Sequence, residues 1–365
     1  MQIGIPREIK SHEGRVALLP AQVEVLVAAG HTVHVETGAG RLSAAEDAAY
    51  VGAGARIAAD AEALFAASEL VVKVKEIMPG EYGYLRREQI LLTNIHSALN
   101  RGLTDQLLEV GLTAFAAEDT HRNGSPNCPL AGEIGAFEGV RLCLTPHGGS
   151  GRHFMRHFGS APLHAVVIGL GGVGQGALRT LLRLGCRVTG LDIDSGARYR
   201  TELAYPGAEL ETAGIECLPA LLGDADLIVN CVMWDKSRSD HLITRADLAR
   251  MRRTAVIADI SCDTAGAVET TRPTTWAEPT YVEEGITHFC VDNIPGAASV
   301  TASAGYGRAL LPHILAIAEH GPLQAARDNP WLARGLSFVA GELTHAETGR
   351  YQQRPFTPVE ELLAR

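Results

Sequence analysis

The sequence has no apolar run of about 18 residues, so it predicts no membrane-spanning helix. Its seven cysteines are an odd number, are scattered and include no C-x-x-C pair, which argues against a disulfide framework and against a zinc ribbon. The first residues lack the basic region and the apolar stretch of a secretory signal peptide. Together these absences predict a protein of the reducing cytoplasm.

Basic side chains are outnumbered by acidic ones. The chain has 32 Lys and Arg against 42 Asp and Glu, a formal net charge of -10. Such a surface repels nucleic-acid phosphates and anionic lipid headgroups, so we expect neither nucleic acid nor membrane as a partner. A small anionic substrate remains compatible with this charge, because a few Arg and Lys residues can reverse the sign inside a cleft.

The chain length and the apolar pattern are typical of two α/β domains. The 365 residues suffice for two domains of ordinary size, and short apolar runs alternate with helical patterns. This alternation predicts β-α-β units and mainly parallel sheets. In the first part we expect strands at Gln2–Ile5, His31–Glu36, Leu70–Val74, Gln89–Asn94 and Thr113–Ala117, and helices at Pro20–Ala29, Ala61–Ala67 and Thr104–Val110. Asp60 is expected to cap the second of these helices, and Gly30 to end the first.

A segment rich in turn formers, residues 123–127, precedes a second alternation. Its expected strands are Ala165–Gly169, Arg187–Leu191, Leu227–Cys231, Ala255–Ile260 and His288–Val291. The pattern is helical from about Ser299 to Glu319 and then mostly helical or irregular, with too few strands for a third domain. We therefore predict that the chain returns to the first domain. The expected fold is two doubly wound α/β domains, residues 1–127 with 300–365 and residues 128–299, with the ligands in the cleft between them.

A glycine-rich turn follows the first strand of the middle domain. Gly169, Gly171 and Gly174 form a G-x-G-x-x-G motif between a strand and a helix predicted at Gln175–Leu184. The first glycine permits the tight turn, the second lets the backbone approach a pyrophosphate, and the third permits close packing of helix on strand. The next strand ends at Asp192, 18 residues after Gly174, where an acidic residue accepts hydrogen bonds from the adenosine ribose. Residues 128–299 are therefore predicted to be a dinucleotide-binding Rossmann domain.

The charge of Asp192 favours NAD over NADP, because a carboxylate repels the 2′-phosphate of NADP. Arg198 follows six residues later, and its positive charge could offset the repulsion between Asp192 and the 2′-phosphate. We expect NAD as the cofactor, and we predict that Asp192→Ala reduces the preference for NAD over NADP.

Three candidate groups stand out in the first half. Arg15 precedes a predicted helix, while Lys75 and His96 follow successive predicted strands. Taken singly, each has an ordinary explanation: Arg15 and Lys75 as solvated surface charges, and His96 as a hydrogen-bonded histidine at a strand end.

Short motifs along the whole chain supply the context for these groups. The motifs, in order, are residues 1–10, 15–18 and 73–76, the loop 148–151, the glycine fingerprint, and residues 259–263, 272–275, 293–295, 320–321 and 329–330. As an ordered set, they resemble the alanine dehydrogenases and the related transhydrogenase alpha-subunit. The resemblance implies an NAD-dependent amino-acid dehydrogenase, which reversibly deaminates an L-amino acid to a 2-oxo acid and ammonia. It also implies a homo-oligomer, with a hexamer as the expected size.

The resemblance assigns a role to each candidate. Arg15 would pair with the substrate carboxylate, and Lys75 would hold the carbonyl or imine end. His96 would be the general acid/base, Asp263 would lie beside the nicotinamide and the reacting carbon, and Asn293 would lie near the nicotinamide ring. The chemistry agrees, because an arginine fork suits a carboxylate, a histidine suits proton transfer near neutral pH, and a cationic lysine polarises a 2-oxo group.

Some segments depart from the alanine dehydrogenase pattern. Ala131 and Gly132 stand where alanine dehydrogenases typically carry a methionine and a serine, and we interpret them as a widened pocket wall. Residues 230–236, 241–245, 263–266 and 291–295 are instead similar to lysine-forming saccharopine dehydrogenases. Those enzymes reductively couple an amino group of one amino acid to a 2-oxo acid. We therefore expect L-alanine not to be the best substrate, and a longer amino acid, or a 2-oxo acid with a primary amine, to be used better.

Three other functions are compatible with parts of this sequence. An opine- or saccharopine-type dehydrogenase is the runner-up, followed by a transhydrogenase component and a non-catalytic NAD-binding regulator. His153 and His157 are four residues apart, so on a helix they would share a face as metal ligands. We nevertheless predict no metal site, because no carboxylate stands at a recognised ligand spacing and the chemistry needs no metal.

Overall fold

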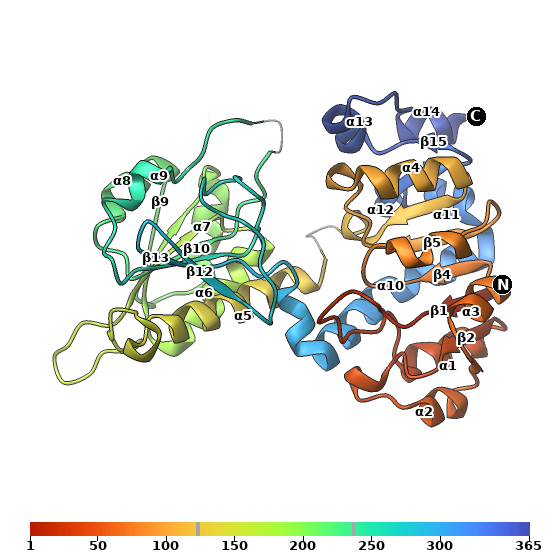
Figure 1. Cartoon of the computed structure of the whole chain (residues 1–365), viewed down its shortest axis with the longest axis horizontal. Coiled ribbons are helices and arrows are strands. Elements are labelled where there is room, and N and C mark those ends of the chain that lie inside the picture. The colour runs from red at the N-terminus through yellow and green to blue at the C-terminus, as the bar shows by residue number, and fades with distance from the viewer. Residues whose placement is uncertain (122–124, 236–237) are drawn as a thin grey trace. The chain divides into compact units, whose positions relative to one another are not determined.

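The computed structural model describes residues 1–121, 125–235 and 238–365. The chain forms two compact units: unit 1, Met1–Pro126 with Gly296–Arg365, and unit 2, Asn127–Pro295 (Figure 1). Residues 123 and 124 of the predicted turn-rich break, and Lys236 of the saccharopine-like segment, lie outside the described residues. No described helix is long and apolar enough to cross a membrane.

Unit 1 is built on a mainly parallel sheet in the order β15-β14-β6-β5-β4-β1-β2-β3. Its strands are β1 (Gln2–Ile5), β2 (Thr32–Glu36), β3 (Arg56–Ala58), β4 (Leu70–Val72), β5 (Ile90–Thr93), β6 (Thr113–Ala116), β14 (Leu336–Val339) and β15 (Glu342–Leu343). Its helices are α1 (Pro20–Ala28), α2 (Asp47–Gly52), α3 (Ala61–Ala67), α4 (Arg101–Val110), α10 (Ser299–His320), α11 (Pro322–Asp328), α12 (Pro330–Gly335), α13 (Ala346–Gln352) and α14 (Val359–Ala364).

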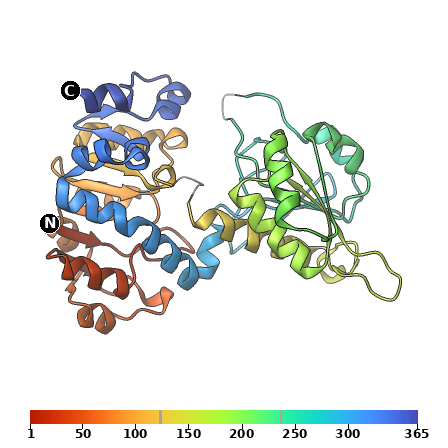
Figure 2. The same ribbon diagram turned by 180° about the vertical axis from the view of Figure 1, so that it is seen from behind.

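Both faces of this sheet are buried. Leu70 and Val72 pack with α1 and α10 into one apolar core, while Val71, between them, packs with α3 and α4 into a second core. Figure 1 shows α3 and α4 in front of the sheet. Figure 2, which views the molecule from behind, shows the long helix α10 and α1 on the other face. Side chains of a strand alternate between its two faces, so an unbroken apolar run such as Leu70–Val72 suits a strand covered on both sides.

Unit 2 repeats this plan with a sheet in the order β12-β13-β11-β10-β7-β8-β9, in which only β12 runs antiparallel among the described strands. Its elements are β7 (His164–Ile168), β8 (Arg187–Leu191), β9 (Leu210–Ala213), β10 (Leu227–Asn230), β11 (Val256–Asp259), β12 (Thr280–Glu283), β13 (Ile286–Phe289), α5 (Asn127–Leu142), α6 (Gly172–Leu184), α7 (Ser195–Ala204), α8 (Leu218–Leu221) and α9 (Arg245–Leu248). Ala165 and Val167 face one core and Val166 and Ile168 the other. The predicted α/β class with two doubly wound sheets is thus confirmed.

The C-terminal segment is mostly helical or irregular, as predicted, with α10, α11, α12, α13 and α14. It also contributes two short strands that were not predicted, β14 and β15, and β14 pairs antiparallel with β6 of the first sheet. Ala340 and Gly341, both with positive φ, form the tight turn between these two short strands. The helix ends predicted at Asp60 and Gly30 are confirmed: Asp60 accepts from Ala63 N at 2.8 Å, and Gly30 has φ +87° just beyond α1.

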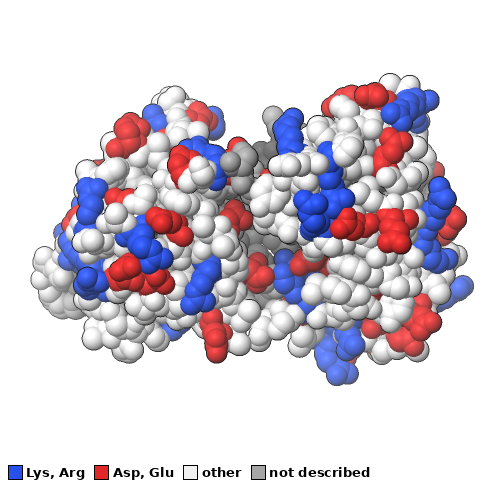
Figure 3. Space-filling view, turned by 45° about the horizontal axis from the view of Figure 1, so that its top comes forward, with Lys and Arg blue, Asp and Glu red and all other residues white. Residues whose placement is uncertain are grey.

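Charged side chains are distributed over both units. Figure 3 shows acidic and basic residues interspersed on the visible face of each unit. All seven cysteines are free thiols, in keeping with the predicted absence of a disulfide framework.

Candidate active site

Three of the predicted site residues follow neighbouring strands of unit 1. Arg15 lies in the segment after β1, Lys75 after β4 and His96 after β5. These strands are parallel and adjacent, in the order β5-β4-β1, so their carboxyl ends lie along one edge of the sheet. That edge is where open α/β sheets bind ligands.

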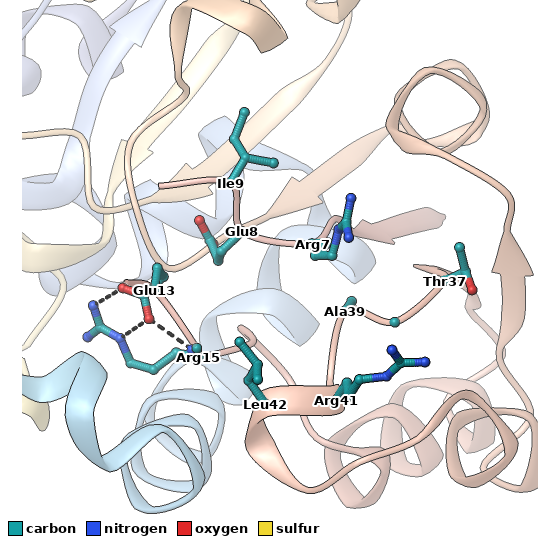
Figure 4. Close-up of a pocket in the computed structure, with 11 residues that line it drawn as sticks. Arg7, Glu8, Ile9, Glu13, Arg15, Thr37, Ala39, Arg41 and Leu42 are labelled. Atoms are coloured by element: carbon teal, nitrogen blue, oxygen red, sulfur yellow. Dashed lines mark hydrogen bonds and ion pairs between the residues drawn. The ribbon is translucent and has the colours of Figure 1, made fainter. Parts of the chain in front are cut away.

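Arg15 is buried and is held by a carboxylate from its own segment. Its Nε donates to Glu13 Oε1 at 2.8 Å and its Nη2 to Glu13 Oε2 at 2.6 Å, which makes a two-pronged ion pair (Figure 4). A cavity of about 710 Å³ opens beside this pair and is also lined by Arg7, Glu8 and Arg41. The Nε–Nη2 edge of Arg15 therefore holds one carboxylate.

Lys75 is held by a pair of glutamates. Glu8 Oε1 accepts from the backbone N–H of Val74 at 2.6 Å and of Lys75 at 3.3 Å. The Lys75 Nζ lies 3.7 Å from Glu76 Oε2, and Lys10 Nζ lies 3.1 Å from Glu76 Oε1. Burial opposes ionisation of Glu76, but the two lysine cations outweigh it and lower the pKa of Glu76 to about 2. Glu76 is therefore ionised at neutral pH and serves as a counter-charge for Lys75.

A second lysine of the same segment is fully buried. Lys73 forms ion pairs with Glu81 and, at 3.6 Å, with Glu8. Burial alone would lower the pKa of Lys73, but these two carboxylates reverse the effect and raise it. The backbone carbonyl of Lys73 accepts from Tyr306 Oη at 2.9 Å. We therefore interpret Lys73 as a buried cation that stabilises the segment after β4, which also carries Lys75.

His96 is the most accessible of the three groups. Its side chain is 53% exposed and its backbone is left-handed, with φ +48°. Glu118, which follows β6, accepts from the backbone N–H of His96 at 2.7 Å and lies 3.5 Å from its Nδ1. The strained backbone is fixed by this carboxylate, which also lies within reach of one ring nitrogen. Such a partner orients an imidazole for proton transfer.

The glycine fingerprint of unit 2 has the geometry of a phosphate-binding turn. Gly169 has φ +88°, and a Cβ at Gly174 would lie only 1.9 Å from the carbonyl oxygen of Gly169. Gly171 caps α6, and a Cβ there would meet no atom within 4 Å, so its backbone is open to approach. The N-terminal N–H groups of α6 are a ready site for phosphate.

Asp192 lies at the end of β8 beside this turn. Its Oδ2 accepts from Leu170 N at 2.7 Å and its Oδ1 from Asp194 N at 2.8 Å. Arg198 Nη1 donates to the main-chain carbonyl of Asp192 at 2.6 Å. The guanidinium of Arg198 is thus engaged with the backbone, and the carboxylate of Asp192 is fixed next to the glycine turn.

The loop that carries Asp263 is organised by a buried carboxylate, Asp259. Its Oδ1 accepts from Asn230 Nδ2 at 2.8 Å and from the backbone N–H groups of Ser261 and Cys262, each at 3.1 Å. Thr271 donates to the other oxygen at 2.6 Å. Burial raises the pKa of Asp259, although these donors act against the shift. This network holds the turn immediately before Asp263.

Asn293 lies in the same unit, after β13. It is 3% exposed, and its carbonyl oxygen accepts from Trp276 Nε1 at 3.1 Å. The site residues named from the sequence thus divide between the units: Arg15, Lys75 and His96 in unit 1, and the glycines, Asp192, Asp263 and Asn293 in unit 2.

The interpretation of Gly132 as a widened pocket wall is wrong. A Cβ at Gly132 would lie 1.9 Å from the carbonyl oxygen of Val173, so this glycine lets α5 pack directly against α6. Gly176 serves the same contact from the other helix, since its Cβ would lie 2.0 Å from Pro129 O. Ala131 is partly buried against the core of unit 2. The missing side chain of Gly132 therefore permits close helix packing and does not widen a pocket.

The shared helical face considered for His153 and His157 does not form. Both residues lie outside helices, with ring centroids 5.9 Å apart, in a loop where His157 makes an isolated bridge with Ser160. Within residues 1–121, 125–235 and 238–365, no group of three His, Cys, Asp or Glu side chains is arranged to hold a metal ion.

Sequence reasoning did not identify the carboxylates that hold the candidate groups. Glu13 and Glu76 are near or next to their partners in sequence, so an acid beside each cation was an available signal. Glu118 is 22 residues from His96, and only the pairing of β5 with β6 brings the two together.

Comparisons with known proteins cover the chain from end to end. Residues 4–130 match the family described as "Alanine dehydrogenase/PNT, N-terminal domain", and residues 136–346 match its C-terminal domain. The chain is 35% identical to an alanine dehydrogenase of Methanococcus maripaludis over 100% of both chains, and 37% identical to one of Halomonas elongata over 94% of this chain and 95% of the relative. A solved L-alanine dehydrogenase superposes with a TM-score of 0.88 at 35% identity, over 97% of this chain and 99% of that one.

Proposed function

The chain belongs to the alanine dehydrogenase/PNT family, and from this premise we propose that it is an NAD-dependent amino-acid dehydrogenase. The proposed reaction is the reversible oxidative deamination of an L-amino acid to a 2-oxo acid and ammonia. The observation that carries the proposal is the presence of Arg15, Lys75 and His96 at the carboxyl ends of adjacent parallel strands. We further propose that the enzyme works in the cytoplasm as a homo-oligomer, as the family resemblance implies.

The glycine turn of unit 2 fits a dinucleotide. Gly174 has no room for a side chain, the backbone of Gly171 is open to approach, and the carboxylate of Asp192 is fixed beside the turn. These features support our proposal that the turn binds the pyrophosphate and Asp192 the ribose hydroxyls. NAD, when bound, would supply the hydride acceptor for the reaction. We propose Asp263 and Asn293 as the residues of unit 2 beside the nicotinamide.

The chain's own groups account for the remaining chemistry. Arg15 would bind the α-carboxylate of the substrate. Loss of hydride from Cα leaves an iminium ion, to which water adds, and ammonia then leaves. His96 would take the proton from the water and return one to the departing amine. Lys75 would donate to the nitrogen or oxygen on the reacting carbon and, in the reverse direction, polarise the 2-oxo group.

A panel of amino acids tests this function directly. We expect the protein to reduce NAD with an L-amino acid, and the reverse reaction to need a 2-oxo acid with ammonia. The observations still in favour of a larger substrate are Ala131 and the saccharopine-like segments, and each methylene group accommodated shifts preference by about 1–3 kcal/mol. We therefore expect kcat/KM for a longer amino acid to exceed that for L-alanine.

The outcomes of the panel separate the candidates. If alanine with ammonia is used best, the protein is an ordinary alanine dehydrogenase. If the reverse reaction runs with a primary amine such as lysine and not with ammonia, the runner-up, an opine- or saccharopine-type dehydrogenase, is correct. If no amino acid reduces NAD or NADP, the proposed function fails.

The cofactor preference is tested by Asp192→Ala. Removing the carboxylate removes both a ribose acceptor and a repulsive charge, so the ratio of kcat/KM for NAD to that for NADP should fall by ~10-fold or more, as expected for a lost charged hydrogen bond. Asp194→Ala is the matched control, because Asp194 is exposed and lies two residues further on. An unchanged ratio in Asp192→Ala would remove Asp192 from the cofactor site.

A further inference from the structure

The pairing of Arg15 with Glu13 is unusually complete for two residues so close in sequence. The side chain of Glu13 is 0% exposed and that of Arg15 is 4% exposed. Besides the two guanidinium contacts, Glu13 Oε1 accepts from the backbone N–H of Arg15 at 2.8 Å. One carboxylate thus fixes both the backbone and the guanidinium of the same residue.

The segment that carries this pair is itself anchored on both sides. Ser43 Oγ donates to the carbonyl of Gly14 at 2.8 Å, and Ser303 Oγ accepts from the N–H of Val16 at 3.0 Å. The two hydroxyls are joined at 2.9 Å. A Cβ at Gly14 would lie 3.2 Å from the Cβ atoms of Leu42 and Ser299, so the turn fits tightly between its neighbours. The backbone that carries the Glu13 carboxylate is therefore held in place by these contacts.

We propose that Glu13 is a positioning residue for Arg15. By occupying the Nε–Nη2 edge, it sets the plane of the guanidinium that is proposed to bind the substrate α-carboxylate. This inference rests on the proposed function, in which Arg15 binds that carboxylate. A misplacement of ~1 Å at a substrate-holding group can cost ~10²-fold, so a fixed guanidinium has a direct kinetic consequence.

A purely structural role makes a different prediction. A buried ion pair that only stabilises the fold would, when broken, lower stability and the amount of active enzyme, and would leave the KM of the surviving enzyme unchanged. A positioning role acts through Arg15 alone. Its loss raises the KM for the amino acid and leaves the binding of the dinucleotide unchanged.

The test is Glu13→Gln, assayed with the amino acid that the wild-type protein oxidises best. We expect the KM for this amino acid to rise by ~10-fold or more, with kcat changed by less than ~3-fold and the Kd for NADH unchanged. Glu81→Gln is the matched control, because it alters a buried carboxylate on Lys73 in the same unit. Glu13→Asp keeps the negative charge on a shorter side chain, so its KM should lie between those of the wild type and Glu13→Gln. This variant also tests the proposal if Glu13→Gln does not fold.

A double-mutant cycle with Arg15→Met completes the test. If Glu13 acts through Arg15, adding Glu13→Gln to Arg15→Met should change the KM by less than ~2-fold. A multiplicative loss in the double variant, or a normal KM in folded Glu13→Gln and Glu13→Asp, would overturn the proposal. If Arg15→Met itself keeps the wild-type KM, the assigned role of Arg15 in the proposed function fails. If Arg15→Met raises the KM but the Glu13 variants do not, only this inference fails.

Discussion

Replacing His96 by alanine is expected to lower kcat by ~10²–10⁴-fold, the usual contribution of a positioned general acid/base. The deamination needs a proton taken from water and another returned to the leaving amine, and His96 is the titratable side chain proposed for both transfers. Binding of NADH should be unchanged, because the glycine turn belongs to unit 2 and His96 to unit 1. Steady-state turnover and NADH fluorescence titration measure the two quantities separately.

His320→Ala is the matched control for this experiment. His320 belongs to the same unit, its side chain is 56% exposed, and it lies 3.8 Å from a carboxylate, Glu319. It therefore has a similar exposure and a neighbouring carboxylate, as His96 does, but lies at the end of α10. Turnover in His96→Ala within a few-fold of that in His320→Ala would contradict the acid/base role.

The buried strands could be predicted from sequence because they are unbroken apolar runs. The predicted strands in the middle of both sheets agree with β1, β4, β5, β7, β10 and β11 to within two residues at each end. Three of the missed strands, β3, β9 and β12, lie at sheet edges and are partly exposed. The other two, β14 and β15, are only four and two residues long. An edge strand needs fewer apolar side chains, so composition does not separate it from a loop.

The candidate site was predictable only in part, for a similar reason. Arg15, Lys75 and His96 follow strands that the α/β pattern predicts to be parallel, so these residues could be expected at the carboxyl-end edge of the sheet. The pairing of His96 with Glu118 depends on which strand lies next to β5, and no local pattern encodes it. Gly132 was misinterpreted because a glycine at a helix contact and a glycine at a pocket wall are identical in sequence.

The three proposed site residues of unit 1 have one feature in common, a neighbouring carboxylate. Each is held by a carboxylate: Arg15 by Glu13, Lys75 by Glu76, and His96 by Glu118. A buried cation such as Arg15 or Lys75 needs a counter-charge, and Glu13 and Glu118 also accept from the backbone N–H of the residue that they hold. The cost is that Arg15 and Lys75 are partly neutralised before any substrate binds. Lys75 is where this matters most, since its proposed role depends on a full positive charge near the reacting carbon.

The other large effect is therefore expected for Lys75→Met, which keeps the aliphatic stem and removes the charge. We expect kcat/KM for the reductive direction to fall by ~10²–10³-fold, because the 2-oxo group loses the donor that stabilises its developing negative charge. Lys10→Met is the control, because Lys10 contacts the other oxygen of the same Glu76 carboxylate, and this variant should lose less than ~10-fold in kcat/KM. Each variant removes one of the two lysine cations that lower the pKa of Glu76, so their comparison separates the effect of Lys75 on the reacting carbon from its effect on Glu76. If Lys75→Met and Lys10→Met lose activity equally, the lysines serve only to balance Glu76, and the carbonyl-polarising role of Lys75 is wrong.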